Sequence, residues 1–172
     1  MWVIFVAIPI ALVLVVVSGG SIRRVVDAPW RAVWLIILSA LVPIPLSIWA
    51  TPADRGAWWP FLVTELAFGL MILWCWLNRW LSSAIALIAL GTFLNMAVIA
   101  ANNGAMPIRS SENFETHLYR PERSGDRLTV LDDWIGLPGE NYISLGDLLV
   151  MAGFIGTVVV TGRKRARSAT HA

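Results

Sequence analysis

Glu65 is the residue whose type conflicts most with its surroundings. It lies in an apolar run, residues 58–77, whose length matches the roughly 20 helical residues that cross a membrane. With a helical rise of about 1.5 Å per residue, its carboxyl group is expected roughly 10 Å inside one boundary of that span. An ionisable group there is costly unless it is paired, protonated or hydrated, so Glu65 is a candidate for ligand or proton binding. The structural alternative is a Glu65–Asn95 hydrogen bond, because Asn95 has a similar depth in the next run.

Asp147 also allows two interpretations. In the string Ser144-Leu145-Gly146-Asp147, an acid follows a serine by three positions, directly before an apolar run. This spacing is typical of a capping box, in which the serine hydroxyl accepts a hydrogen bond from the Asp147 N–H and the carboxylate accepts one from the Ser144 N–H. The functional alternative is a carboxylate that binds a ligand, or that acts as acid or base together with Glu65 or Asp133.

Asp132 and Asp133 stand in an otherwise apolar segment, between Leu131 and Trp134. Because carboxylates in such a segment are usually matched by a cation or a backbone donor, we expect both to bind a partner group. The same loop offers four candidate cations: Arg109, Arg120, Arg123 and Arg127.

Asn102 and Asn103, followed by Gly104, end another apolar run. Asn and Gly readily take the left-handed conformation of a helix C-cap, which is the structural interpretation. The functional interpretation adds both asparagines to the candidate ligand- or partner-binding residues. His117 stands alone in a polar stretch and His171 near the C-terminus, so each is expected to be solvated. The sequence predicts no metal site and no cofactor.

Five apolar runs must position these residues. They are near the length that crosses a membrane and cover residues 2–20, 32–50, 58–77, 81–101 and 144–161. The first lacks the basic start and the small-residue cleavage site of a signal peptide, so we interpret it as a span. Pro43 and Pro45 are expected to kink the second. The predicted fold is all-α: a bundle of five transmembrane helices forming a single membrane domain, residues 1–172.

Charge orients the predicted bundle. The connections after the first and third runs, together with the tail (residues 162–172), carry eight basic residues and one acid; the opposite side carries five basic residues and nine acids. The positive-inside rule therefore places the N-terminus and the long loop, residues 102–143, outside, and the C-terminus in the cytoplasm. The rear of this loop, residues 128–139, is apolar and is expected to lie on the membrane or to pack over the bundle. The tail residues expected to anchor anionic lipid are Arg163, Lys164, Arg165 and Arg167.

Composition favours the same location. Hydrophobic residues make up 58% of the 172 residues and charged residues 14%. Many of the ten Trp residues lie at the ends of apolar runs, where membrane proteins carry aromatic belts. The net charge is only +2, so no basic face for nucleic acid is expected.

The C-terminal half resembles a family of small bacterial membrane proteins of unknown function. The resemblance rests on Asn103-Gly104-Ala105-Met106-Pro107, His117, Leu131-Asp132-Asp133, Pro138 and Ser144-Leu145-Gly146-Asp147. It implies a multi-pass protein of the bacterial plasma membrane with no assigned activity. It also groups the outer loop with the start of the last span.

The same half is more distantly similar to lipoprotein signal peptidases, membrane aspartyl proteases whose two catalytic aspartates lie at the outer face. Val130-Leu131-Asp132-Asp133-Trp134-Ile135 is similar to their Val-Val-Asp-Phe-Ile element, and Tyr142-Ile143-Ser144-Leu145-Gly146-Asp147 is similar to Phe-Asn-x-Ala-Asp, which holds one aspartate. Their other aspartate follows an Asn by three positions, where this chain has Val98 after Asn95. The resemblance therefore implies Asp147 as one catalytic residue, and needs Glu65 or Asp133 as the second.

Two functions follow as expectations. The first is a non-enzymatic integral membrane protein that binds membrane lipid or other membrane protein subunits through its outer loop, as an accessory subunit of a larger complex. The second is an aspartyl hydrolase at the outer membrane face, or an inactive relative of one.

Overall fold

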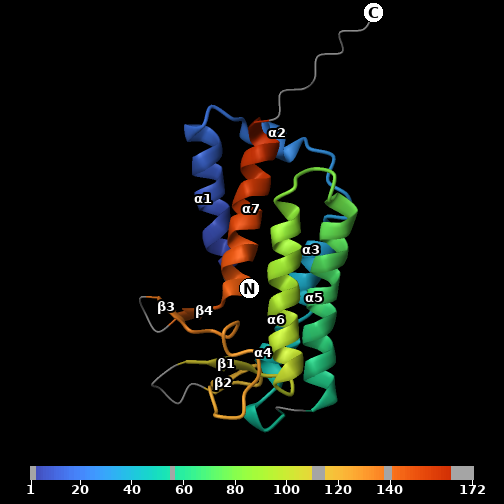
Figure 1. Ribbon diagram of the computed structural model, residues 1–172. Coiled ribbons are helices and arrows are strands. Elements are labelled where there is room, and N and C mark those ends of the chain that lie inside the picture. The colour runs from blue at the N-terminus through green and yellow to red at the C-terminus, as the bar shows by residue number, and fades with distance from the viewer. Residues whose placement is uncertain (1–2, 55–56, 110–114, 138–140, 164–172) are drawn as a thin grey trace, which may run out of the picture.

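The computed structural model describes residues 3–54, 57–109, 115–137 and 141–163, and over these ranges the chain is mostly helical (Figure 1). The helices are α1 (Val3–Val17), α2 (Ile22–Val26), α3 (Trp34–Leu41), α4 (Ile44–Trp49), α5 (Trp58–Asn78), α6 (Ile85–Ala101) and α7 (Leu145–Arg163), with a 3-10 turn at Pro52–Asp54. Within the described ranges, α5 and α7 are long and apolar enough to cross a membrane, and the other apolar helices are shorter. The predicted helical character is confirmed, and the number of membrane crossings stays a prediction.

Most helices are shorter than the predicted spans. Ala32 has a positive φ of 47°, and α3 begins only at Trp34. Val42 and Pro43 separate α3 from α4, so the break expected at the prolines is present. Its cause is that proline has no backbone N–H with which to continue the helix. The short helix α2 was not predicted.

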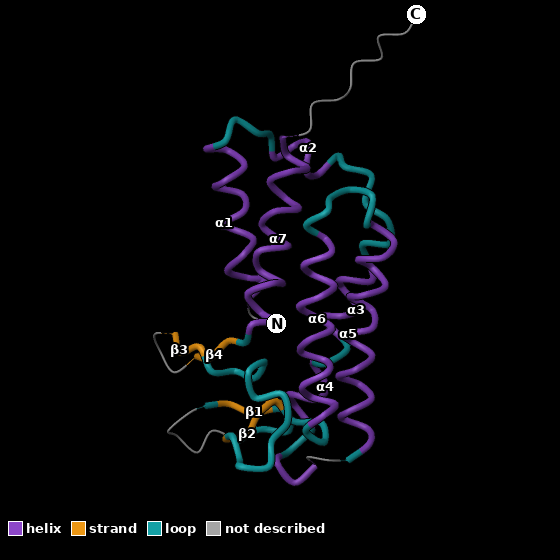
Figure 2. Tube along the Cα trace, in the orientation of Figure 1, coloured by secondary structure: helices purple, strands orange, loops and turns teal. Residues whose placement is uncertain are grey.

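The last helix lies at the centre of the bundle. α7 packs against α1 on one side and against α6 on the other, while α5 packs on α6 and α3 on α5 (Figure 2). α2 crosses the end of α7, where the Ser21 N–H and the Arg24 guanidinium donate to the Gly162 carbonyl at 3.0 and 3.3 Å. This α2 end is at the top of Figure 1, and the opposite strand end, which carries all the described strands, is at the bottom.

Glycines allow α6 and α7 to approach closely. A Cβ added to Gly91 would collide with the Gly146 carbonyl oxygen. A Cβ added to Gly153 would lie 2.7 Å from the Ile88 backbone nitrogen and 2.8 Å from the Ala84 carbonyl oxygen. Backbone atoms in a helix cannot move aside singly, so these contacts hold the two helices at a fixed distance. Small residues at such contacts are typical of helices packed within membranes.

Four short strands lie at the strand end, where the sequence analysis did not predict them. β1 (Met106–Ile108) pairs in parallel with β2 (Tyr119–Pro121), and β3 (Ile135–Leu137) pairs antiparallel with β4 (Asn141–Ile143). Ile108 also forms a parallel bridge with Asp133. Three segments of the long loop therefore meet at β1.

The rear of the long loop packs over the bundle at Leu131, which is one of the two placements expected for residues 128–139 from sequence. Leu131 lies against a buried cluster of Val98, Ile99 and Met106. Within the loop, the Arg120 guanidinium donates to Asp126 at 2.8 Å, and both side chains are buried. This hydrogen bond lowers the pKa of Asp126, so the pair is charged at neutral pH and stabilises the loop from within.

Two asparagines hold connections at opposite ends of the bundle. Asn102, directly after α6, donates to the carbonyl four residues earlier and to the Arg127 carbonyl, both at 2.9 Å, and accepts from the Arg127 N–H at 2.9 Å. Asn78, the last residue of α5, donates to the carbonyl four residues earlier and to the Arg31 carbonyl, both at 2.9 Å, and accepts from the Arg31 N–H at 2.8 Å. Each side chain therefore finishes its own helix and fixes a distant segment to it.

The α6–α7 contact predicts the effect of one methyl group. Gly153→Ala should lower the free energy of unfolding by about 1–3 kcal/mol, because the new Cβ meets the backbone of α6. Gly69→Ala is the matched control, since a Cβ at Gly69 on α5 meets nothing within 4 Å. It should be neutral or stabilising by up to about 1 kcal/mol, because alanine favours helices over glycine. Thermal unfolding in detergent checks both, and equal effects would contradict the close α6–α7 contact.

Candidate functional site

A cavity of about 260 Å³ lies inside the strand end of the bundle, bounded by α4, α5, α6, α7 and the first two strands. Its apolar wall includes Leu46, Ala67, Phe68, Met71, Ile99, Met106 and Val150. Its polar wall consists of Ser47, Thr64, Thr92, Asn95, His117, Tyr119, Asp133 and Asp147. The cavity therefore combines an apolar surface between helices with a small set of hydrogen-bonding and acidic groups, which is the usual composition of a binding site for a small molecule.

A closed ring of hydrogen bonds joins α6 to the start of α7 at this cavity. The Asp147 N–H donates to Oγ of Ser144 at 3.0 Å, and the Ser144 hydroxyl donates to Oδ1 of Asn95 at 2.8 Å. The Asn95 amide then donates to Oδ1 of Asp147 at 2.9 Å. Because a carboxylate oxygen can only accept, the Asn95 NH2 must face Asp147, and this turns Oδ1 of Asn95 toward the Ser144 hydroxyl.

This ring corrects two structural expectations. The first half of the predicted capping box is present, but the Asp147 carboxylate accepts from Asn95 rather than from the Ser144 N–H. The expected Glu65–Asn95 hydrogen bond is wrong, because the Asn95 amide bonds to Ser144 and Asp147. Glu65 is half-buried on α5 outside the cavity lining, and its Oε1 has no hydrogen-bond partner among the described residues.

Asp133 is held at the cavity by its backbone. Its N–H donates to the Pro107 carbonyl at 3.2 Å, and its carbonyl accepts from the Arg109 N–H at 3.0 Å. Its side chain is only 4% exposed, and Oδ1 has no hydrogen-bond partner in the described part of the chain. Burial, together with the negative charge of Asp147, raises the pKa of Asp133 to about 8. Asp133 is therefore mostly a neutral acid at pH 7.

Asp132 is not among the residues that line the cavity, but it is also buried. It is fully inaccessible, and neither carboxylate oxygen has a hydrogen-bond partner within the described ranges. Burial raises its pKa to about 6; the charge of Glu122 acts in the same direction, and Arg109 opposes it. The two adjacent acids therefore differ in placement: Asp133 reaches the cavity and Asp132 does not.

The expected arginine partners of these acids are bound elsewhere. Among the described residues, Arg120 pairs with Asp126, Arg109 with Glu122 at 3.0 Å and Arg123 with Glu115 at 3.9 Å. Arg127 joins Asn102 through its backbone. The prediction that one of them neutralises Asp132 or Asp133 by direct contact is wrong, because each described arginine side chain in an ion pair has its own carboxylate within the loop.

His117 and Tyr119 belong to the cavity, although the sequence analysis did not select them as site residues. His117 is half-buried in the lining, and burial lowers its pKa, while its expected contact with solvent stays a prediction. Burial raises the pKa of Tyr119, and the charges of Asp133 and Asp147 add to this rise. The parallel pairing of Tyr119 with Met106 brings both residues to the site, and no spacing in the sequence indicates that pairing.

The remaining candidate residues lie outside the cavity. Asn102 is buried in its structural role, and Asn103 is exposed with a φ of 55° before Gly104 at 83°, which confirms the predicted C-cap. Arg163 ends α7, whereas Lys164, Arg165 and Arg167 lie outside the described residues. Within the described ranges, no group of three or more His, Cys, Asp or Glu side chains is placed to hold a metal ion.

Comparison with known proteins gives one match. Residues 27–159 match the model of a family of unknown function (DUF5317). The chain belongs to this family. The DUF5317 match runs from the end of α2 into α7 and so includes every described residue of the cavity lining. The expected membership of a family without an assigned function is confirmed. No curated protein and no solved structure matches, and the similarity to lipoprotein signal peptidases stays a prediction.

The raised pKa of Asp133 predicts a pH-dependent stability. Because this pKa is about 8 in the folded protein against an ordinary value of 3.8, folding retains a proton that the unfolded chain loses. Stability should therefore fall as the pH rises from about 4 to about 8. Asp133→Asn removes the ionisation and should match the wild type near pH 4. At pH 9 the melting temperature of the variant should exceed that of the wild type by about 4 °C or more. This difference corresponds to roughly 1–2 kcal/mol in the free energy of unfolding.

Thermal unfolding of both proteins between pH 4 and pH 9 is the measurement. Asp27→Asn serves as the control, since Asp27 is an exposed acid at the α2 end. Melting curves whose difference does not change with pH would contradict a buried, neutral Asp133.

Proposed function

We propose that this protein is an integral membrane protein that binds an amphiphile from the membrane in the cavity at the strand end. The observation that carries the proposal is the cavity itself, with its apolar wall between helices and its acids at the strands. Of the two occupants expected from sequence, lipid and a protein subunit, a cavity of this size between helices supports the lipid-like one. Its volume, near the low end of the roughly 300–1,000 Å³ typical of small-molecule sites, suits a head group and the first part of a chain.

The proposal includes five membrane crossings, made by α1, α3 with α4, α5, α6 and α7. Large apolar side chains stand exposed on each of these segments: Val13, Ile37, Leu62, Phe93 and Val160. Only 33% of the most apolar window of α5 and of α7 is buried inside the protein. Apolar surface of this extent is unfavourable in water and favourable against lipid tails. The shorter helices can be matched by local thinning of the bilayer.

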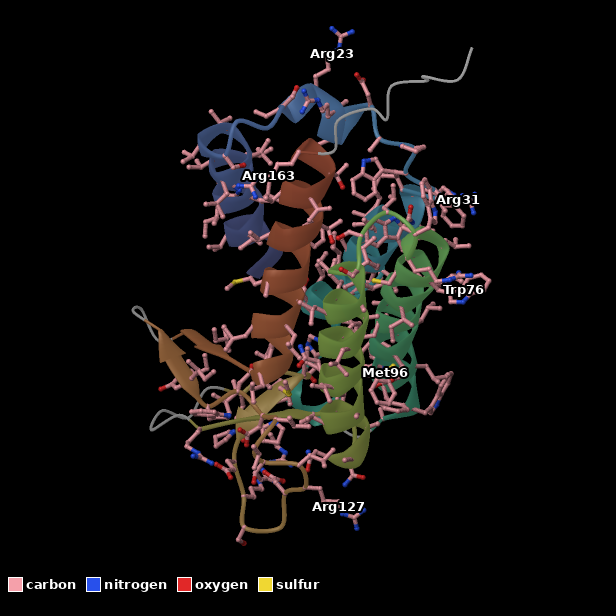
Figure 3. All side chains as sticks on the ribbon, turned by 45° about the horizontal axis from the view of Figure 1, so that its top comes forward. Arg23, Arg31, Trp76, Met96, Arg127 and Arg163 are labelled. Atoms are coloured by element: carbon pink, nitrogen blue, oxygen red, sulfur yellow. The ribbon has the colours of Figure 1, made fainter. Side chains whose placement is uncertain are left out.

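We further propose that the α2 end is cytoplasmic. Arg23, Arg31 and Arg163 lie toward the α2 end and Arg127 lies at the strand end (Figure 3). Arg79 and Arg31 also contact the rings of Trp76 and Trp80, with 4.6 and 5.4 Å from the guanidinium carbon to the ring centre. Basic and aromatic side chains together are typical of the cytoplasmic interface. The cavity and the long loop then face the outside of a bacterial plasma membrane.

Cysteine labelling tests this orientation. In a Cys75→Ser background, Ser124→Cys in the long loop should react with a membrane-impermeant maleimide in intact spheroplasts. Ser83→Cys, in the turn before α6, should react only after the membrane is opened. Both serines are exposed, so the pair is matched for access. The reverse pattern would overturn the orientation, and equal labelling of both would overturn the crossing by α6.

A photoreactive probe tests the binding site. An eight-carbon alcohol with a diazirine at its far end should label Phe68, Met71 or Val150 in the wild-type protein in nanodiscs. Ala67→Phe, which fills the cavity from α5, should reduce this labelling about tenfold, equivalent to a loss of about 1.4 kcal/mol of binding. Gly69→Phe is the matched control, because Gly69 faces open space on the same helix.

Labelling at the exposed residues Leu62 and Leu66 of α5 reports how much probe enters the bilayer, and cavity labelling is expressed relative to it. Cavity labelling that Ala67→Phe leaves unchanged would overturn the binding function.

Aspartyl hydrolysis is the second candidate function. The observation that favours it is that Asp133 and Asp147 line the same cavity, and an aspartyl mechanism needs one protonated and one ionised carboxyl group. The pKa of about 8 suits Asp133 for the protonated role. Glu65 does not take part in this version, since it lies outside the cavity lining. An ester or amide amphiphile recovered in cleaved form from the wild type, and intact from Asp147→Asn, would favour hydrolysis over binding.

A further inference from the structure

The cavity contains more negative than positive groups. Asp133 and Asp147 line it, and Asp132 is buried directly beside Asp133 in the chain. Asp147 has one described donor on its carboxylate, the Asn95 amide, while Oδ1 of Asp133 has none within the described ranges. Asp133 is only 4% exposed, and a buried Oδ1 without a donor is costly, so a proton or a bound cation would satisfy it.

The protein supplies no described cation to this pair. The ion pairs found in the described loop bind Arg109, Arg120 and Arg123 to glutamate or aspartate side chains outside the cavity lining. Among the described residues that line the cavity, the only basic side chain is His117, whose pKa is lowered by burial. At neutral pH this histidine is therefore an uncharged group rather than a counter-ion for Asp133 or Asp147.

We propose that the amphiphile bound in this cavity carries a primary ammonium head group that pairs with Asp133 and Asp147. This inference rests on the proposed binding function and specifies the chemistry of its ligand. An ammonium group has three N–H donors and no acceptor, so it can donate to both carboxylates at once. An alcohol has one donor and no charge, and a carboxylate or phosphate head group would be repelled by whichever of the two acids is ionised.

The rest of the cavity fits the apolar part of such a ligand. Phe68 and Met71 on α5, Ile99 on α6 and Val150 on α7 supply the apolar part of the same lining. Leu46 and Ser47 form the wall at α4, and Ser47 is also exposed, so the cavity lies next to the outer surface of the bundle there. A chain that leaves the cavity beside α4 would pass among the exposed side chains Ile48 and Trp49, in contact with lipid.

Binding of a cation should be coupled to release of a proton. The charges that act on Asp133 are those of Asp147 on α7 and its neighbour Asp132, which raise its pKa, and that of the N-terminal amino group, which lowers it. Tyr119 and His117 on the loop line the same cavity. With Asp133 mostly neutral below pH 8, an ammonium group must displace its proton before the two can pair. An alkyl ammonium keeps its own charge over this range, since the ordinary pKa of a Lys amine is about 10.4. The preference for an ammonium head group should therefore increase between pH 6.5 and pH 8.5.

The test compares three photoreactive probes that share an eight-carbon chain with a diazirine at its far end and differ in the head group: amine, alcohol or carboxylate. Labelling of the cavity is measured in nanodiscs of zwitterionic lipid and divided by labelling at Leu62 and Leu66, which corrects for the partition of each probe into the bilayer. In the wild type the amine should exceed the alcohol about tenfold, a ratio that corresponds to about 1.4 kcal/mol. The carboxylate should give the weakest signal of the three.

Two variants and one control show whether Asp133 and Asp147 cause the preference for the amine probe. Asp133→Asn and Asp147→Asn should each bring the ratio of amine to alcohol close to one while the alcohol still labels the cavity. Asp27→Asn, at an exposed acid paired with Arg23 at the α2 end, should leave the ratio unchanged. A ratio that persists in both cavity variants, or that does not rise between pH 6.5 and pH 8.5, overturns the pairing.

The outcomes also separate this inference from the binding function. Equal labelling by the amine and the alcohol, sensitive to Ala67→Phe, would leave the binding function standing and remove the ammonium head group. Absence of cavity labelling by all three probes would remove both.

Discussion

The structure depends on one requirement: each buried polar group needs a hydrogen-bond partner. The apolar interior of the bundle offers few such partners. At the junction of α6 and α7, Asn95, Ser144 and Asp147 meet this need by bonding in a closed ring. Gly146 leaves the room for it, because a Cβ there would collide with Oδ1 of Asn95. All three hydrogen bonds of the ring form only when α6 and α7 are aligned in one way along their axes. The ring therefore fixes the start of α7 relative to α6 and places the Asp147 carboxylate at the cavity.

The same requirement governs the two ends of the bundle. Asn102 and Asn78 use one arrangement twice: each amide group closes its own helix and forms a two-way bond with the backbone of a distant segment. At the strand end this fixes the long loop at Arg127, six residues before Asp133, which is then aligned by its bonds to β1. The position of the second cavity acid is therefore a consequence of backbone pairing, and it does not depend on an ion pair of its side chain.

Helical periodicity explains which parts of the site could be predicted. The apolar runs, the proline break and the cap at Asn103 follow from local preferences, and residues 64, 67, 68 and 71 share one face of a helix by spacing alone. His117 and Tyr119 reach the cavity through pairing between distant loop segments, which no local pattern encodes. Glu65 shows the limit of arguments from depth: its neighbour Thr64 lines the cavity, and a rotation of about 100° per residue turns Glu65 away.

The division of charge within the long loop explains how an acidic cavity can exist in a stable fold. Arg120 and Asp126 stabilise the loop by pairing with each other, so the fold of this segment does not need Asp133 to be ionised or matched. A raised pKa allows Asp133 to remain neutral at pH 7, which limits the cost of burying it. If an arginine had satisfied Asp133, the loop would be more stable and the cavity would have no unmatched group to offer. The unmatched acid therefore contributes nothing to holding the loop together, and buried acids of this kind are typical of functional sites.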